Sequence, residues 1–459
     1  MKTIKLVTAA LAIPFVIASA QQVQLASSER AADTAKKKDS TVTASVFSVV
    51  KPIVIQHIRP NDQRGMNVFE APKTDPVAYT GFKLDFGAAF TQQFQGLQHE
   101  NTAAPVLVAG ANTTSLLKIG NGFNNAVANL YVNAQVAPGI RVAMQSYLSA
   151  RHHQESWVKD GYALIDASPI DIALLNSIMK YTTIKFGHFE INYGDQHFRR
   201  SDNGQTMYNP FVGNLITDAF TTEVGGEIYV RKSGYLAMFS MTGGEVKGTV
   251  LTPERRSPSY IAKLGVDKQL TQDLRVRLTG SSYKNDNSAS NTLFTGDRAG
   301  SRYYDVMENV SGTGTAWSGE VRGANFANRV QAFVVNPFIK FQGLELAGNI
   351  ETATGKSLYG TAFENGYRTF RQLAGDVVYR FWDEKLYAGY RYNTVAGTFQ
   401  KNWTDANVNR WQVAGGWFVN PMMELKAEYM NQKYYRFPTN DIRNGGFIKG
   451  FMVEAALAF

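Results

Sequence analysis

Apolar and polar residues alternate along most of the chain from residue 81 to its end. In the last stretch the odd positions from Phe447 to Phe459 are apolar apart from Lys449, and the even positions are small or mixed. This period of two predicts a β-strand with one apolar face. Such a strand at a chain end aggregates in water unless its edge is paired. The pattern favours a transmembrane barrel; the alternative is the last strand of a soluble sheet.

Similar alternating segments occur in pairs that are joined by tight turns, at residues 137–139, 232–234, 271–273, 342–343, 383–384 and 420–421. The connections between these pairs are long and polar, at residues 93–120, 151–156, 193–219, 247–256, 285–325, 355–366, 394–406 and 431–444. The sequence therefore predicts an all-β fold, a transmembrane antiparallel up-and-down β-barrel of about 16 strands, with short periplasmic turns and long extracellular loops. A soluble sandwich does not separate its loop lengths in this way.

Two places depart from the regular pattern. Ser168 and Pro169 stand where a tight turn is expected, and Ser at an N-cap with Pro at the first helical position predicts a short periplasmic helix over residues 168–177. Pro337 interrupts an alternating segment, and because proline donates no backbone hydrogen bond we expect a β-bulge there.

The N-terminal part of the chain is organised differently. Lys2 and Lys5 precede an apolar run and a small-residue cleavage site, so residues 1–20 are predicted to be a secretory signal peptide. Residues 21–77 are expected to form a periplasmic extension, with a short strand or plug element as an interpretation of residues 46–55, and residues 78–459 the barrel. The chain has no cysteine, which excludes disulfides, thiolate metal sites and a lipidated cysteine.

Charged residues occupy many of the positions that alternate with the lipid-facing ones. The predicted lumen-lining residues are Lys83, Arg141, Lys185, Arg275, Arg277, Arg380, Arg391, Arg410, Glu223, Glu227, Glu424 and Glu428. A dry core does not hold so many ions, because each costs several kcal/mol unless it is paired, whereas a water-filled lumen does. Arg380, Arg391 and Arg410 lie on consecutive predicted strands. They form a basic wall that favours anions, or they pair with lumen acids and stiffen the barrel.

The third long loop, residues 193–219, lies between the fifth and sixth predicted strands. It follows the segment IKFGHFEINYG at residues 184–194. This segment and the overall strand pattern resemble the general and phosphate-selective porins. The resemblance implies that the loop folds into the barrel and narrows it, with Asp195, Arg199, Arg200 and Asp202 as the pore constriction, and it implies a homotrimer. The alternative for Arg199 and Arg200 is a pair of solvated loop arginines.

The end of the chain resembles the C-terminal signal of bacterial outer-membrane barrels, an alternating strand that closes on Phe. The residues that carry this signal are Phe451, Val453, Leu457 and Phe459. The resemblance implies that the barrel-assembly machinery is a partner.

No motif for catalysis or for binding a cofactor or metal is found. The six histidines lack a metal-ligand spacing, and no Gly-x-Ser-x-Gly elbow occurs. The net charge is +9, but the basic residues are dispersed, which disfavours nucleic acid.

We therefore expect no enzyme and no cofactor, but an outer-membrane porin for passive diffusion of small hydrophilic solutes or ions, with a mild anion preference. The alternative is a plugged structural or partner-binding barrel that uses its long external loops; a barrel enzyme is a third. The expected partners are outer-membrane lipid and lipopolysaccharide, small hydrophilic solutes or anions, the barrel-assembly machinery and other outer-membrane proteins.

Overall fold

The structure is a computed structural model. It describes residues 55–70, 73, 77–124, 126–149, 156–244, 256–288, 291–294, 303–309, 326, 328–356, 366–399 and 405–459. The predicted signal peptide at residues 1–20 lies outside the described residues, as does the predicted strand or plug element at 46–55 apart from Ile55.

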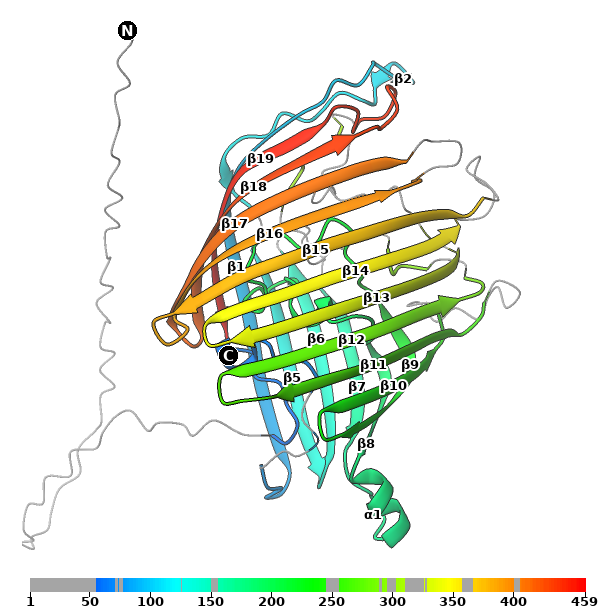
Figure 1. Ribbon diagram of the computed structural model, residues 1–459, viewed down its shortest axis with the longest axis vertical. Coiled ribbons are helices and arrows are strands. Elements are labelled where there is room, and N and C mark those ends of the chain that lie inside the picture. Colours follow the sequence, from blue (N-terminus) through cyan, green and yellow to red (C-terminus); the bar gives the residue numbers. More distant parts are fainter. Residues whose placement is uncertain are drawn as a thin grey trace, which may run out of the picture. The chain divides into compact units, whose positions relative to one another are not determined.

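One antiparallel sheet makes up the body of the protein (Figure 1). It has 17 strands, of which β4 (Gly122–Phe123) has only two residues. The long strands are β1 (Lys83–Glu100), β5 (Val127–Ala137), β6 (Ile140–Ser149), β7 (Ser156–Ile165), β8 (Thr182–Glu190), β9 (Thr222–Lys232), β10 (Tyr235–Thr242), β11 (Ser259–Gln269), β12 (Leu274–Asn285), β13 (Asn328–Phe341), β14 (Leu344–Lys356), β15 (Arg368–Phe381), β16 (Leu386–Gly397), β17 (Ala406–Asn420), β18 (Met423–Tyr435) and β19 (Phe447–Ala458).

The sheet closes on itself. Each long strand pairs with the next, and β19 returns to β1 in a register that runs from Glu100 opposite Phe447 to Ala89 opposite Ala458. Phe459 continues the seam, since its amide N lies 2.9 Å from the Ala88 carbonyl O. The prediction of an up-and-down barrel of about 16 strands is confirmed. The boundary of the first loop is wrong, because residues 93–100 belong to β1 and pair with β19.

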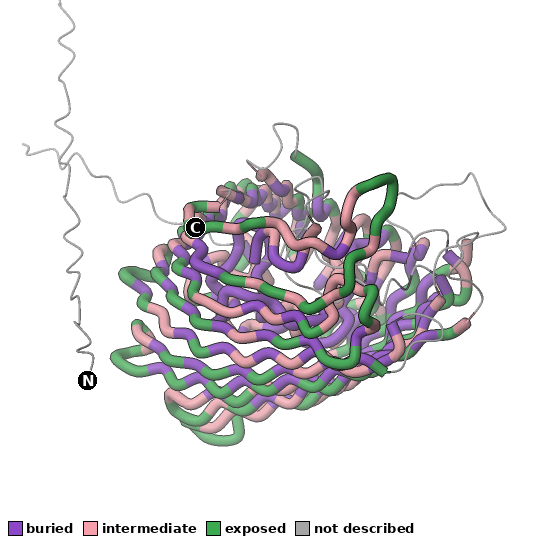
Figure 2. The backbone as a smooth tube through the Cα atoms, turned by 90° about the horizontal axis from the view of Figure 1, so that it is seen from above, coloured by how far each residue is buried: buried purple, intermediate pink, exposed green. Residues whose placement is uncertain are grey.

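The two faces of the wall have opposite character, and buried and exposed residues alternate along the strands (Figure 2). In β15, for example, Gln372 and Asp376 are buried, whereas Leu373 and Val377 are about half exposed. Apolar side chains thus cover the outside and polar ones face the interior, which is here called the lumen. This is the reverse of a soluble protein and is the arrangement of a barrel that crosses a membrane.

The predicted helix exists but begins later than expected. Helix α1 spans Ala173–Met179 and its N-cap position is Ile172. Ser168 is not the cap, because its hydroxyl instead bonds within a turn to Ile170, at 3.3 Å from the Ile170 amide N. Among the described residues, no helix is long and apolar enough to cross a membrane. The minor elements are β2 (Leu107–Val108), β3 (Ala111–Asn112) and the 3-10 helices η1 (Gln63–Gly65) and η2 (Gln196–Phe198).

The prediction of a bulge at Pro337 is wrong. Pro337 stays in register opposite Leu278, and the irregularity between β13 and β14 lies instead between Asn328 and Gln331. Two neighbours accommodate the proline. The side-chain Nδ2 of Asn336 donates to the Gly348 carbonyl at 3.1 Å. Gly348 leaves room for the ring, because a Cβ there would lie 2.8 Å from Pro337 Cγ.

The outward face yields a stability prediction. Val377→Arg places a charge near the middle of β15 on the lipid side, and we expect it to lower the free energy of folding into a bilayer by about 2–4 kcal/mol. Gln98→Arg, on the outer face near the end of β1, is the control and is expected to cost about 0–1 kcal/mol. Urea titration of folding into lipid vesicles measures both, and equal costs would contradict the assignment of this face to lipid.

Candidate functional site

The connection between β8 and β9, residues 191–221, lies inside the barrel and is called the inward loop. Its groups bond to the inner faces of strands on all sides of the lumen. These contacts are Asn203 Nδ2 to the Ala128 carbonyl of β5 (2.7 Å), Asp195 N to Asn336 of β13 (2.9 Å), Thr217 N to Gln372 of β15 (2.9 Å), Ile216 N to Asn393 of β16 (2.6 Å) and Val212 N to Glu428 of β18 (2.8 Å). The inward loop therefore crosses the lumen.

A second element enters the lumen from the end with the short turns. Residues 55–70, which precede β1, are called the floor segment. Gln63 bonds to two of those turns, its amide N to the Pro421 carbonyl (2.8 Å) and its side chain to the Glu384 carbonyl (3.0 Å). Across the mouth, the Gln56 amide N donates to Gln135 of β5 (2.9 Å). The floor segment thus spans the short-turn mouth of the barrel.

The floor segment and the inward loop meet inside the lumen. Arg59 Nη2 donates to the Phe198 carbonyl at 2.8 Å, and its guanidinium lies 3.7 Å from the centre of the Tyr208 ring. Gln205 Nε2 donates to the Asn61 carbonyl at 2.8 Å. Burial of the polar backbone groups of both elements is therefore compensated by hydrogen bonds between them.

Two carboxylates and two cations form an ion cluster between these elements and the wall. Glu70 of the floor segment lies 3.0 Å from Lys263 and 2.7 Å from Arg277. Asp195 of the inward loop lies 2.7 Å and 2.8 Å from the same two cations. Burial alone would raise the pKa of Glu70, but Lys263 and Arg277 outweigh it, so its pKa lies well below 4.5. The cluster fixes both elements to β11 and β12.

Glu345 of β14 is the centre of a second group. Its carboxylate lies 2.8 Å from Arg380 of β15 and 3.5 Å from Arg199 of the inward loop. It also accepts a hydrogen bond from Asn67 of the floor segment at 2.6 Å. One buried carboxylate therefore joins the wall, the inward loop and the floor segment.

A third group holds the inward loop to β7. Lys159 lies 2.6 Å from both Glu190 and Asp202, and Arg200 lies 2.9 Å from Asp202 and 2.8 Å from Asp218. Lys159 was not among the residues predicted to line the lumen. A register shift between β6 and β7 makes it an extra residue in β7, so that Lys159 and the next residue are both buried. The only signal was two adjacent charges within an alternating segment.

The residues predicted as the constriction all lie in the inward loop. Asp195, Arg199, Arg200 and Asp202 are buried and each has an oppositely charged partner within 4 Å. Arg199 and Arg200 are therefore not solvated loop residues. They hold the loop in place.

The predicted lumen-lining residues all fall on strands and none is exposed. Arg141, Arg277, Arg380, Arg391, Arg410, Glu223, Glu227, Glu424 and Glu428 are buried, and Lys83, Lys185 and Arg275 are half-buried. Of the candidate basic wall, Arg380 pairs with Glu345, and Arg391 Nε lies 2.6 Å from Asp376. Arg410 donates to the Asn214 carbonyl of the inward loop. The interpretation that these arginines pair with acids therefore holds for Arg380 and Arg391.

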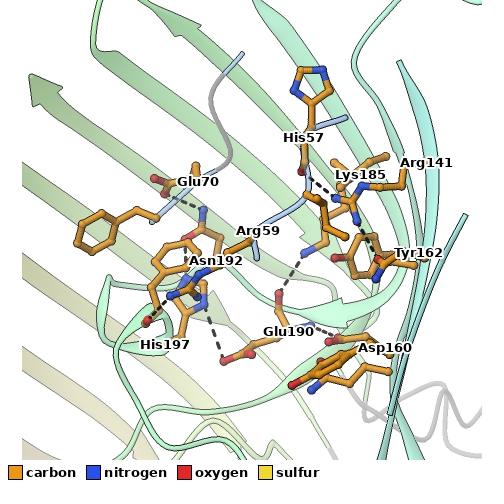
Figure 3. A pocket seen from close by; sticks show the side chains of 18 of the residues that line it. His57, Arg59, Glu70, Arg141, Asp160, Tyr162, Lys185, Glu190, Asn192 and His197 are labelled. Atoms are coloured by element: carbon orange, nitrogen blue, oxygen red, sulfur yellow. Dashed lines mark hydrogen bonds and ion pairs between the residues drawn. The ribbon is translucent and has the colours of Figure 1, made fainter. Parts of the chain in front are cut away.

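A cavity of about 280 Å³ remains between the floor segment, the inward loop and strands β5–β9 (Figure 3). Its charged lining comprises the cations Arg59, Arg141, Lys159, Lys185, Arg200 and Arg231 and the carboxylates Glu70, Asp160, Asp166, Glu190 and Asp202. The space and the polar lining suit water, ions and small hydrophilic solutes.

Charge in the cavity is incompletely balanced. Each lining carboxylate has a cation within 4 Å, Asp160 through Lys159 (3.8 Å) and Asp166 through Lys73 (3.3 Å). Arg59 and Arg141 have no such carboxylate within the described residues. Arg141 donates to Asn133 and to the His57 carbonyl, each at 3.3 Å, and both acceptors are neutral. The lining therefore carries a surplus of positive charge.

His197 also lines the cavity but adds no charge at neutral pH. Burial, with Lys263 nearby, lowers its pKa well below 6.5. Its Nε2 lies 2.9 Å from Asn192 Oδ1. Over the described stretches, no cluster of three or more histidines or carboxylates has the geometry to hold a metal ion.

Comparison with known proteins gives likenesses of fold only. No family model and no curated protein matches the chain. The outer-membrane protein OmpT of Vibrio cholerae is 10% identical over 83% of this chain and 99% of its own, with a TM-score of 0.48. An anion-selective porin from Comamonas acidovorans is 9% identical over 82% and 100%, with a TM-score of 0.47. The outer-membrane channel DcaP of Acinetobacter baumannii is 10% identical over 83% and 99%, with a TM-score of 0.46. The assignment of the fold as a barrel does not depend on these likenesses, because it follows from the closed sheet itself.

The group around Glu345 predicts a large mutational effect. Glu345→Gln leaves Arg199 and Arg380 buried without a counter-charge, so we expect a loss of about 3–5 kcal/mol in the free energy of unfolding. Glu384→Gln is the matched control, since Glu384 pairs with Lys340 (2.6 Å) at the solvent-exposed rim, and we expect it to cost about 0–1 kcal/mol. Chemical denaturation in detergent measures both values, and similar costs would show that the lumen behaves as open solvent.

The depressed pKa of Glu70 predicts a pH-dependent contribution to stability. Its pKa is lower in the folded state, so the unfolded chain takes up the proton first as the pH falls. The stabilisation is therefore complete above pH 4.5, its ordinary pKa, and is lost as the pH drops towards the folded pKa. We expect the difference in the free energy of unfolding between the wild type and Glu70→Gln to be large at pH 7 and to become smaller below pH 4.5. A difference that stays constant from neutral to acid pH would contradict the ion cluster.

Proposed function

We propose that this protein is a porin of the bacterial outer membrane, through which small hydrophilic solutes or ions diffuse passively with a mild anion preference. A closed barrel with apolar residues outside and charged residues inside suits that membrane. We assign the short turns and both ends of the chain to the periplasmic side of the membrane and the long loops to the extracellular side. The proposed partners are the lipids of that membrane, lipopolysaccharide and the barrel-assembly machinery, and the proposed assembly is a homotrimer.

The observation that carries this proposal is the charged cavity beside β5–β9. A pocket with so many ionised groups stays hydrated, and water and small solutes exchange with it readily. Its surplus of positive charge comes from Arg59 and Arg141, and unneutralised cations in a narrow, low-dielectric passage raise the local concentration of anions. Arg380 and Arg391 are paired with acids, so we assign the preference to Arg59 and Arg141 and not to these two arginines.

A second candidate is a plugged barrel that serves as a scaffold or binds a partner through its external loops. Its support is the ion pairing that fixes the inward loop and the floor segment to the wall, in particular at Glu70 and Glu345. The two candidates differ in one measurable property, because a porin conducts ions steadily and a plugged scaffold does not.

Conductance of the refolded protein in a planar bilayer under a KCl gradient tests the porin proposal. We expect steady channels with a reversal potential on the anion-selective side, and Arg141→Gln to reduce the anion-to-cation permeability ratio by a factor of about 2–10. Lys232→Gln, at an exposed position outside the cavity, is the control and is expected to leave the ratio unchanged. A folded protein that never conducts would overturn the porin proposal and favour the plugged barrel.

A further inference from the structure

We propose that the floor segment sets the size limit of the passage, and that Arg59 of this segment determines its charge preference jointly with Arg141 of the wall. This inference rests on the proposed function and deepens it. The solutes that it implies are small hydrophilic anions that can pass beside one fixed guanidinium.

The first support is the placement of the segment across the mouth. It is anchored to well-separated parts of the barrel: Gln56 on β5, Gln63 on the turns after β15 and β17, and Glu70 on β11 and β12. A strap held on several sides of a ring obstructs its centre. A solute that moves between the cavity and the short-turn end must therefore pass beside this segment.

The second support is the state of Arg59. Its Nε donates to the Gly65 carbonyl at 2.9 Å and its Nη2 to the Phe198 carbonyl at 2.8 Å. These neutral acceptors fix the guanidinium, and the Tyr208 ring supports its face. None of these partners cancels the charge, and the side chain lines the cavity (Figure 3). Arg59 is therefore a rigid cation beside the passage.

The third support is the contrast with the inward loop. Its two arginines are neutralised, Arg199 by Glu345 and Arg200 by Asp218 and Asp202. Carboxylates beside a guanidinium remove most of the field that it would exert on a passing ion. The inward loop therefore narrows the lumen. Where it meets the floor segment, the uncompensated positive charge that a solute encounters comes from Arg59.

The absence of cysteine from the chain allows a direct test by chemical modification. Arg59→Cys is expected to lower the anion-to-cation permeability ratio in planar bilayers by a factor of about 2–10. A cationic methanethiosulfonate reagent should restore the ratio, and an anionic one should shift it towards cations. Arg64→Cys is the matched control, because Arg64 lies in the same segment but its side chain is 66% exposed and pairs with Asp62. If the two cysteine variants respond alike to both reagents, Arg59 does not determine selectivity.

Conductance tests the size limit separately. The double variant Glu70→Gln with Asn67→Ala removes the ion pairs of the segment with Lys263 of β11 and Arg277 of β12 and its side-chain bond to Glu345 of β14, while the wall is kept. A higher single-channel conductance than that of the wild type is expected. If the wild type is silent and the variant conducts, the floor segment is the barrier, although the protein is not a constitutive porin. If the wild type conducts and the variant matches it, or if both are silent, the inference is overturned; the first of these outcomes leaves the porin proposal intact.

Discussion

Ionised side chains on the inner face of the wall lose water when the inward loop and the floor segment pack over them, and the compensation of their charge constrains everything else in the lumen. A buried ion without a partner costs several kcal/mol. Lys263 and Arg277 of the wall therefore need both Glu70 and Asp195, one from each inserted element. The interior is organised by matched charges as much as by apolar contacts, and this is why two irregular segments occupy defined positions.

Part of this charge matching can be predicted from the sequence. Asp267 stands opposite Arg277, Lys340 opposite Glu345 and Asp376 opposite Arg391. Each pair flanks a short turn that the alternation already locates, and a short turn fixes which residues face each other. By contrast, Lys185 opposite Glu227 and Lys426 opposite Glu454 are separated by long connections. Loop length gives no register, so these pairs require the structure.

The lumen contents were harder to foresee than the wall. Strand positions follow from a period of two, and the inward course of the third loop followed from a resemblance. The floor segment has no periodicity, and its partners, such as Pro421, are distant in sequence. Lys159 was missed because a bulge breaks the alternation on which the assignment of faces depends. The prediction therefore succeeded where local geometry repeats and failed where one residue or an irregular segment departs from it.

The floor segment also has a consequence for how the molecule is made. It is synthesised before β1 and the other strands of the barrel, yet the Asn61 side chain bonds to the carbonyl of Phe459, 398 positions away. Phe459 lies at the seam where β19 joins β1, so its place is defined only when the circle of strands is complete. The floor segment can therefore make all of its contacts only after β19 has paired with β1. When the first and last strands join during biogenesis, the floor segment must therefore either lie inside the barrel already or still be able to enter it.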